Sequence, residues 1–225
     1  MSGLRDNADR CAPLSGLPLN KQTRMALQPT EIDDRIAAFK GDLATLSLRD
    51  IVRRHIISGS CAALEEDAYY GLRAAVAAKY ELHPNEVLVV GSGKLGFSIA
   101  PQKRYRHFSD TSDIDVVVLS PNLFRRVWRS VHSYEEQGGF WGRAGSFKDY
   151  LFQGWIRPDM LPNAPSFEIA NDWWKFFNSL SSSGQYSPYK IRGALYEDWY
   201  FLESYQARAV SSCVDDLRNM TGDSK

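Results

Sequence analysis

Two aspartates near the middle of this 225-residue sequence have the types and the spacing needed for chemistry. Asp113 and Asp115, the aspartate pair, stand two positions apart at the start of the apolar run 114–119. Because side chains alternate between the faces of a strand, both carboxylates should project from the same face. Two negative charges held so close favour a cation between them. Carboxylates together with substrate phosphates are the usual ligands of Mg²⁺ or Mn²⁺, so we predict catalytic metal ligands here.

A glycine-serine bend supplies the complementary feature. Gly91 and Ser92 directly follow a second apolar run, 86–90. Small residues at such a bend let backbone N–H groups and a hydroxyl approach a polyphosphate closely. Lys94 would neutralise phosphate charge, so Gly91, Ser92 and Lys94 are predicted to bind substrate. In phosphoryl transfer, two metal ions about 3.5 to 4 Å apart can activate the attacking oxygen and stabilise the leaving one.

Other phosphate-binding motifs fit this segment less well. Residues 91–96 match the letters G-x-G-x-x-G, but Pro101 follows closely, and the aspartate pair stands at the amino end of its run. A dinucleotide site needs a helix directly after the glycines and an acid at the carboxyl end of the next strand. A P-loop would need Gly and Ser or Thr where the chain has Leu88 and Leu95. The bend and the pair are also common as a plain turn and cap, but their joint occurrence in this order favours a phosphoryl-transfer site.

These motifs resemble the nucleotidyltransferase superfamily related to DNA polymerase beta. More narrowly, they are similar to uncharacterised bacterial members, some of which occur in anti-phage defence or toxin–antitoxin contexts. The matching residues are Gly91-Ser-x-Lys94-Leu-Gly-Phe-Ser98 and Ser112-Asp-Ile-Asp115. The resemblance implies a mixed sheet with helices, a nucleoside triphosphate substrate and a two-metal site holding Mg²⁺ or Mn²⁺. The implied reaction transfers a nucleoside monophosphate to an acceptor hydroxyl on RNA, a protein or another nucleotide.

The sequence departs from the family pattern in the spacer between its two motifs. The segment 93–112 is longer than the usual spacer and carries Lys103, Arg104, Arg106 and His107. This basic loop would clamp a phosphate tail or nucleic acid, or it is a solvated surface loop, as charge runs usually are.

A second departure concerns the third carboxylate that the resemblance implies on a later, neighbouring strand. The expected strand 189–196 has no acid before Glu197 and Asp198 at its end, and Asp159 and Glu168 are the other candidates. If none of them approaches the aspartate pair, the protein binds nucleotide without turnover. It would then act as a binding or regulatory subunit of a defence or toxin–antitoxin complex.

The hydrophobic pattern predicts an α/β (α+β) fold, a nucleotidyltransferase-like mixed sheet flanked by helices, with a helical N-terminal extension and a C-terminal helix. Residues 1–30 are expected to be a flexible arm and 31–225 a single domain. Strands are expected at 86–90, 114–119 and 189–196, and an irregular insertion at 140–166. Helices are expected at 31–43, 48–56, 61–80 with Ser60 as the cap, 121–137, 171–180 and 199–218.

Composition limits the classes of partner. Lys plus Arg and Asp plus Glu each number 27, so no global field attracts nucleic acid or an anionic membrane, and a polyanion must be held locally. No apolar stretch approaches the roughly 20 residues of a membrane helix, so no membrane contact is expected. The N-terminus lacks the apolar region of a signal peptide, which favours the cytoplasm. A partner protein is expected to dock through the arm or an aromatic surface.

Overall fold

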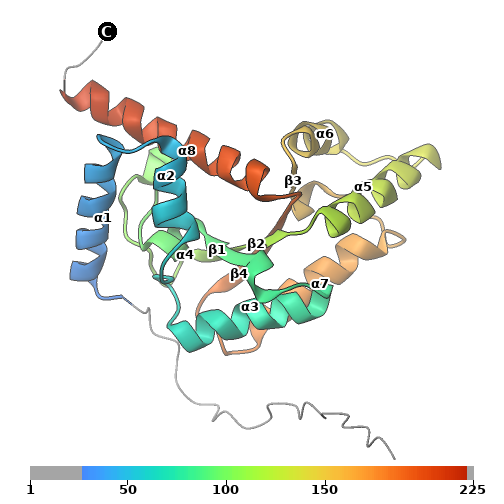
Figure 1. The fold of residues 1–225 in the computed structure, drawn as a ribbon. Coiled ribbons are helices and arrows are strands. Elements are labelled where there is room, and N and C mark those ends of the chain that lie inside the picture. Colours follow the sequence, from blue (N-terminus) through green and yellow to red (C-terminus); the bar gives the residue numbers. More distant parts are fainter. Residues whose placement is uncertain (1–26, 222–225) are drawn as a thin grey trace, which may run out of the picture.

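The computed structural model describes residues 27–221, whose strands form one mixed four-stranded sheet (Figure 1). The strands are β1 (Val87–Val90), β2 (Asp113–Leu119), β3 (Trp155–Ile156) and β4 (Lys190–Tyr196). Their order in the sheet is β1-β2-β4-β3. Strand β1 is antiparallel to β2, β2 is parallel to β4, and β3 is antiparallel to β4. The predicted mixed α+β fold with flanking helices is confirmed.

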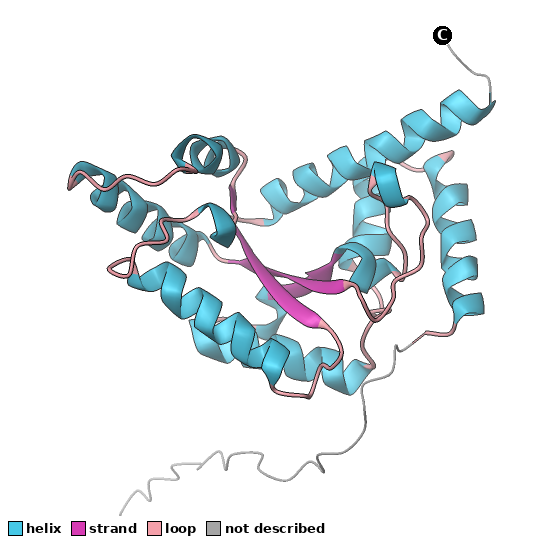
Figure 2. Cartoon of the chain, turned by 180° about the vertical axis from the view of Figure 1, so that it is seen from behind, coloured by secondary structure: helices cyan, strands magenta, loops and turns pink. Residues whose placement is uncertain are grey.

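Helices cover both faces of this sheet (Figure 2). They are α1 (Pro29–Leu43), α2 (Leu48–Ile51) with a π-helical turn at Val52–Ile57, α3 (Glu66–Tyr80), α4 (Gly91–Leu95), α5 (Pro121–Glu136), α6 (Ala144–Phe152), α7 (Glu168–Ser182) and α8 (Trp199–Thr221). Single 3₁₀ turns stand at Pro84–Glu86, Pro101–Lys103 and Pro158–Met160. Residues 1–26 of the predicted arm lie outside the described residues, and α1 begins at Pro29, inside the predicted arm boundary.

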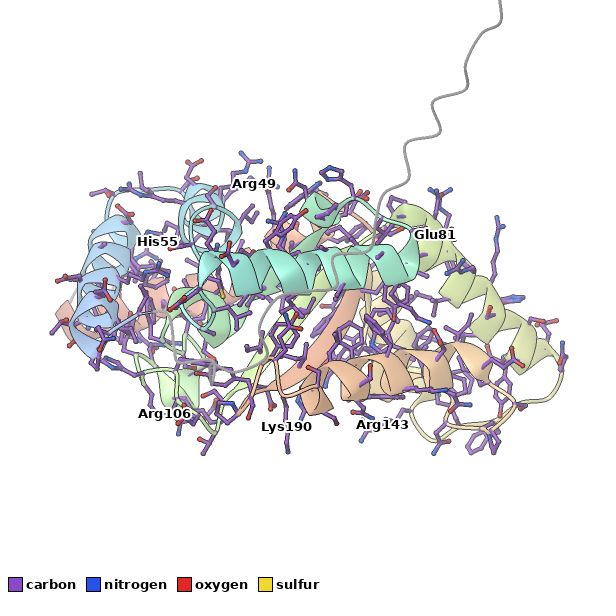
Figure 3. All side chains as sticks on the ribbon, turned by 90° about the horizontal axis from the view of Figure 1, so that it is seen from below. Arg49, His55, Glu81, Arg106, Arg143 and Lys190 are labelled. Carbon is purple, nitrogen blue, oxygen red and sulfur yellow. The ribbon has the colours of Figure 1, made fainter. Side chains whose placement is uncertain are left out.

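The side chains of β2 alternate between the two faces of the sheet and so contribute to two separate hydrophobic layers. Ile114, Val116 and Val118 pack in the layer that contains the apolar side chains of α3, α5 and α7. Val117 and Leu119 pack in the opposite layer, with α1, α2 and α8. Helices α3 and α7 lie side by side on the first face, where an ion pair joins them (Figure 3). The near-continuous apolar sequence of β2 is therefore that of a central strand buried on both faces.

Two expectations about local structure are wrong. Ser60 does not cap α3, which begins at Glu66; its hydroxyl instead accepts a hydrogen bond from Arg35 Nη2 at 2.7 Å. Residues 61–64 are instead buried and bent, and the N–H groups of Ala62 and Ala63 donate to carbonyls of α4. The insertion 140–166 is not merely loop, since it contains α6 and β3. These elements are too short to leave a clear period in the sequence.

Within residues 27–221, the length and apolar character that a membrane-crossing helix requires are not found in any helix.

Candidate functional site

The antiparallel pairing of β1 with β2 brings the glycine-serine bend to the aspartate pair. Val90, the last residue of β1, is paired with Asp115. Gly91 follows with φ of +64°, a left-handed conformation that favours glycine. A Cβ atom added at Gly91 would lie 3.2 Å from Asp115 Oδ2. The structure thus brings Gly91 and Ser92 together with Asp113 and Asp115, in the arrangement expected from the two motifs.

Two adjoining cavities meet at Asp115. The larger, the aromatic cavity, has a volume of about 560 Å³ and the smaller, the basic cavity, about 270 Å³. Both are lined by Asp115 and by Ser92, Ser98 and Ala100. The aromatic cavity is also lined by Gly91, Trp155, Arg157, Asp159, Arg192 and Tyr205. The basic cavity is also lined by Lys103, Arg106, His107, Ser112 and Asp113.

The position of the pair at the amino end of β2 explains its access to solvent. Asp113 and Asp115 share the face of β2 that, further along, carries Val117 and Leu119. Those two apolar residues are buried in the layer that includes α8. Asp115 lies beyond that covered stretch, and its side chain is open to the cavities. The strand therefore holds two carboxylates rigidly at the edge of a packed core.

The environment of Asp115 disfavours its ionised form. Desolvation by the surrounding protein raises the pKa of this carboxyl to about 6, although part of the side chain remains open to solvent. The negative charge of Asp113 also raises this pKa, while the Arg192 guanidinium lowers it. An added cation would therefore favour the carboxylate form of Asp115.

Arg192 of β4 is a candidate functional residue that the sequence analysis did not select. It is the parallel partner of Asp115, and its Nε donates to Asp113 Oδ2 at 2.5 Å. On β4 the face shared with the aspartate pair carries Lys190, Arg192 and Ala194, so the neighbouring strand offers no acid there. The sequence analysis could have found this contact only by assuming that the predicted strand 189–196 pairs in parallel with β2 in this register.

None of the four candidates for a third carboxylate joins the aspartate pair. Asp159 lines the aromatic cavity, but Arg157 Nη2 and Arg143 Nη1 bind its Oδ2 at 3.0 Å and 2.9 Å. Among the described residues, no group of three or more acidic, histidine or cysteine side chains is placed to hold a metal ion.

The other three candidates line neither cavity. Glu168 is an exposed residue at the start of α7 and lines neither cavity. Glu197 and Asp198 follow Tyr196, which pairs with Leu119 at the end of β2 remote from the aspartates. Asp198 Oδ1 there accepts a hydrogen bond from the Phe201 N–H and so caps α8. Sequence proximity to β4 was misleading because the acids stand at the wrong end of the strand.

Lys94 is not placed with the other predicted phosphate-binding residues. Its side chain is 1% exposed, lines neither cavity and donates a hydrogen bond to the Gly59 carbonyl. Burial lowers the pKa of Lys94 to about 8. The short helix α4 turns this lysine toward the interior, beside the ring of Tyr69. This placement corrects the expectation that Lys94 contacts substrate phosphate.

The basic loop supplies the positive charge that Lys94 does not. Lys103, Arg106 and His107 line the basic cavity beside Asp113. Figure 3 shows Arg106 at the same edge of the view as Lys190, the strand partner of Asp113. The loop is anchored at both sides: His107 Nε2 lies 2.8 Å from Asp33 Oδ1 of α1, and Arg104 bonds the Ser212 carbonyl of α8 at 2.8 Å. The loop is therefore held against α1 and α8 through Arg104 and His107, while Lys103 and Arg106 remain exposed.

Lys94 makes a testable contribution to the pH dependence of stability. Its folded pKa of about 8 lies below the usual 10.5, so between these values the unfolded chain holds a proton that the folded chain lacks. The free energy of unfolding should then rise with pH. From pH 8 to pH 9, wild type should gain about 1 kcal/mol more than Lys94→Met. Urea unfolding at both pH values measures this, and the exposed Lys175→Met is the control. Parallel curves for wild type and Lys94→Met would contradict the prediction.

Comparison of the chain with protein-family models, with curated proteins and with solved structures finds no match. The chemistry of the site is therefore inferred from its own residues.

Proposed function

We propose that this protein binds a nucleoside triphosphate with Mg²⁺ or Mn²⁺ and transfers a nucleoside monophosphate to an acceptor hydroxyl on RNA, a protein or another nucleotide. One observation carries the proposal. The aspartate pair faces the Gly91–Ser92 bend where two cavities of different chemistry meet. An aromatic cavity on one side and a basic cavity on the other suit the two ends of a nucleotide.

The aspartate pair fits a divalent cation. Its carboxylates project from one face of β2, the bend opposite has no side chain at Gly91, and desolvation together with the charge of Asp113 raises the pKa of Asp115. Hard oxygen ligands of this kind suit Mg²⁺ or Mn²⁺. Asp113 and Asp115 would hold the ion, which would neutralise charge on the phosphates during transfer.

The remaining residues of the site bind and orient the substrate. Ser92 and the basic side chains of Lys103 and Arg106 would hold the phosphate chain in the basic cavity. Trp155 and Tyr205 would exclude water from the nucleoside in the aromatic cavity. The oxygen of the acceptor hydroxyl would then bond to the α-phosphorus as the bond to the pyrophosphate oxygen breaks, and the hydroxyl proton would pass to solvent. Positioning of these two oxygens in line supplies much of the catalysis in such reactions.

A second function is favoured by one specific observation. The strand beside the aspartate pair presents Arg192 where the resemblance implies a carboxylate. Without a third acid the site would bind nucleotide and metal and not turn them over. The protein would then be a binding or regulatory subunit of a defence or toxin–antitoxin complex.

Two assays separate the proposals. Incubation with each α-labelled nucleoside triphosphate, Mn²⁺ or Mg²⁺, and cell RNA or lysate should label an acceptor if the protein is a transferase. Calorimetry with the same nucleotides and Mn²⁺ measures binding independently of turnover. Metal-dependent binding without labelling would select the subunit function. Absence of binding for all four nucleotides would refute both.

A further inference from the structure

Arg192 is the cation that already compensates the aspartate pair. Its Nε donates a charge-assisted hydrogen bond to Asp113 Oδ2 over a distance of 2.5 Å. Strand pairing also places the Arg192 backbone beside Asp115. No other Lys, Arg or His among the described residues forms an ion pair with either aspartate. A divalent ion bound by both carboxylates therefore competes with this guanidinium for Asp113.

The Arg192 side chain has room to move and a second place to bind. It is 54% exposed and lines the aromatic cavity together with Gly91, Ser92 and Asp115. The backbone beneath it has no such freedom, because a Cβ at the next residue, Gly193, would lie 2.2 Å from the Phe177 ring. Displacement would thus swing the side chain across the cavity without moving β4.

We propose that Arg192 is a phosphate-binding residue of this site: it leaves Asp113 when a divalent ion binds and then binds the triphosphate that arrives with the ion. This inference rests on the proposed function. Guanidinium groups bind phosphate oxygens in a bidentate manner, which suits Arg192 to either partner.

The exchange makes metal and triphosphate depend on one another. Metal alone competes with Arg192 for Asp113 and offers the guanidinium no new contact in return. Triphosphate alone is repelled by the two carboxylates, and the arginine that would bind it is still paired with Asp113. When both bind, each negative group has its own cation, so each ligand strengthens the binding of the other by the same factor.

The test uses Mn²⁺ alone and a preformed Mn²⁺–tripolyphosphate complex, which avoids a choice of nucleobase. Calorimetry compares wild type with Arg192→Gln, and with Arg125→Gln as the matched control on the remote, exposed face of α5. Arg192→Gln should bind Mn²⁺ alone about tenfold more tightly, because the ion no longer competes with a charge-assisted contact at Asp113. It should bind the complex about tenfold more weakly, because the charge-assisted contact from Arg192 to the phosphate is lost. Asp113→Asn added to Arg192→Gln should remove the gain for Mn²⁺. Arg125→Gln should match wild type.

Other results would overturn the inference in distinguishable ways. Unchanged or weaker Mn²⁺ binding by Arg192→Gln would refute the role of Arg192. If wild type still bound the complex in an Asp113-dependent manner, the proposed function would stand. If neither protein bound Mn²⁺ or the complex, both proposals would fail. Circular dichroism checks that each variant is folded. Arg192→Lys keeps the positive charge and loses the bidentate guanidinium geometry, so its affinities for Mn²⁺ and for the complex should lie between those of wild type and Arg192→Gln.

Discussion

Replacing Asp115 by asparagine should reduce nucleotidyl transfer by about a hundred- to a thousandfold, the range seen when one preorganised electrostatic contact to a reacting group is removed. Asp113→Asn should have a similar effect, because the two carboxylates would share one cation. The measurement is incorporation of α-labelled nucleotide at saturating Mn²⁺, with metal-coupled nucleotide binding followed by calorimetry.

A nearby carboxylate provides the control for general charge effects. Asp110 is exposed, lies three residues before Asp113 and lines neither cavity. Asp110→Asn removes the same charge from the loop just before β2 and should retain transfer and binding within about twofold, since exposed charges are strongly screened. Equal losses in Asp110→Asn and Asp115→Asn would show that local charge, and not the paired geometry, matters.

Gly91→Val should lower transfer by about a hundredfold, because displacement of a reacting group by about 1 Å has effects of that size. The added Cβ would lie 3.2 Å from Asp115 Oδ2, which requires the carboxylate to shift by a few tenths of an ångström, and the two valine methyl groups would displace it further. Transfer and metal-coupled nucleotide binding are the measurements, as for the aspartate variants.

The matched control isolates the cost of the backbone conformation. Gly138 also has a positive φ, of +81°, but a Cβ there would meet nothing within 4 Å. Each valine should reduce the free energy of unfolding by about 1 to 3 kcal/mol through the left-handed backbone. Only Gly91→Val should lose nucleotide binding. Loss of binding in Gly138→Val, or its retention in Gly91→Val, would show that Gly91 is a structural turn alone.

Local patterns in the sequence were sufficient for the elements that carry the site. Strands β1 and β2 are short apolar runs bounded by polar residues, and they appear close to the expected bounds. The two-residue spacing of Asp113 and Asp115 determines that they share a face, because the period of a strand is two. Helix α5 begins where Pro121 predicts it, with the Ser120 hydroxyl accepting from the Leu123 N–H. All of these depend on residues that are neighbours in the chain.

The direction of buried and charged side chains depended on packing between distant segments. The spacing of Lys94 from the bend suggested a phosphate contact, but residues 61–64 pack against α4 and enclose this lysine. The basic loop looked solvated in sequence, yet its residues bond to Asp33 on α1 and to Ser212 on α8.

The sequence by itself determined the paired carboxylates and the glycine-serine bend, since both are properties of residues a few positions apart. Only the tertiary structure decided which cation stands beside the pair. Arg192 is 79 residues from Asp113 and reaches it through the parallel pairing of β2 with β4. Register between strands so far apart is decided by how their apolar faces pack into the two layers of the core, and no local pattern encodes it.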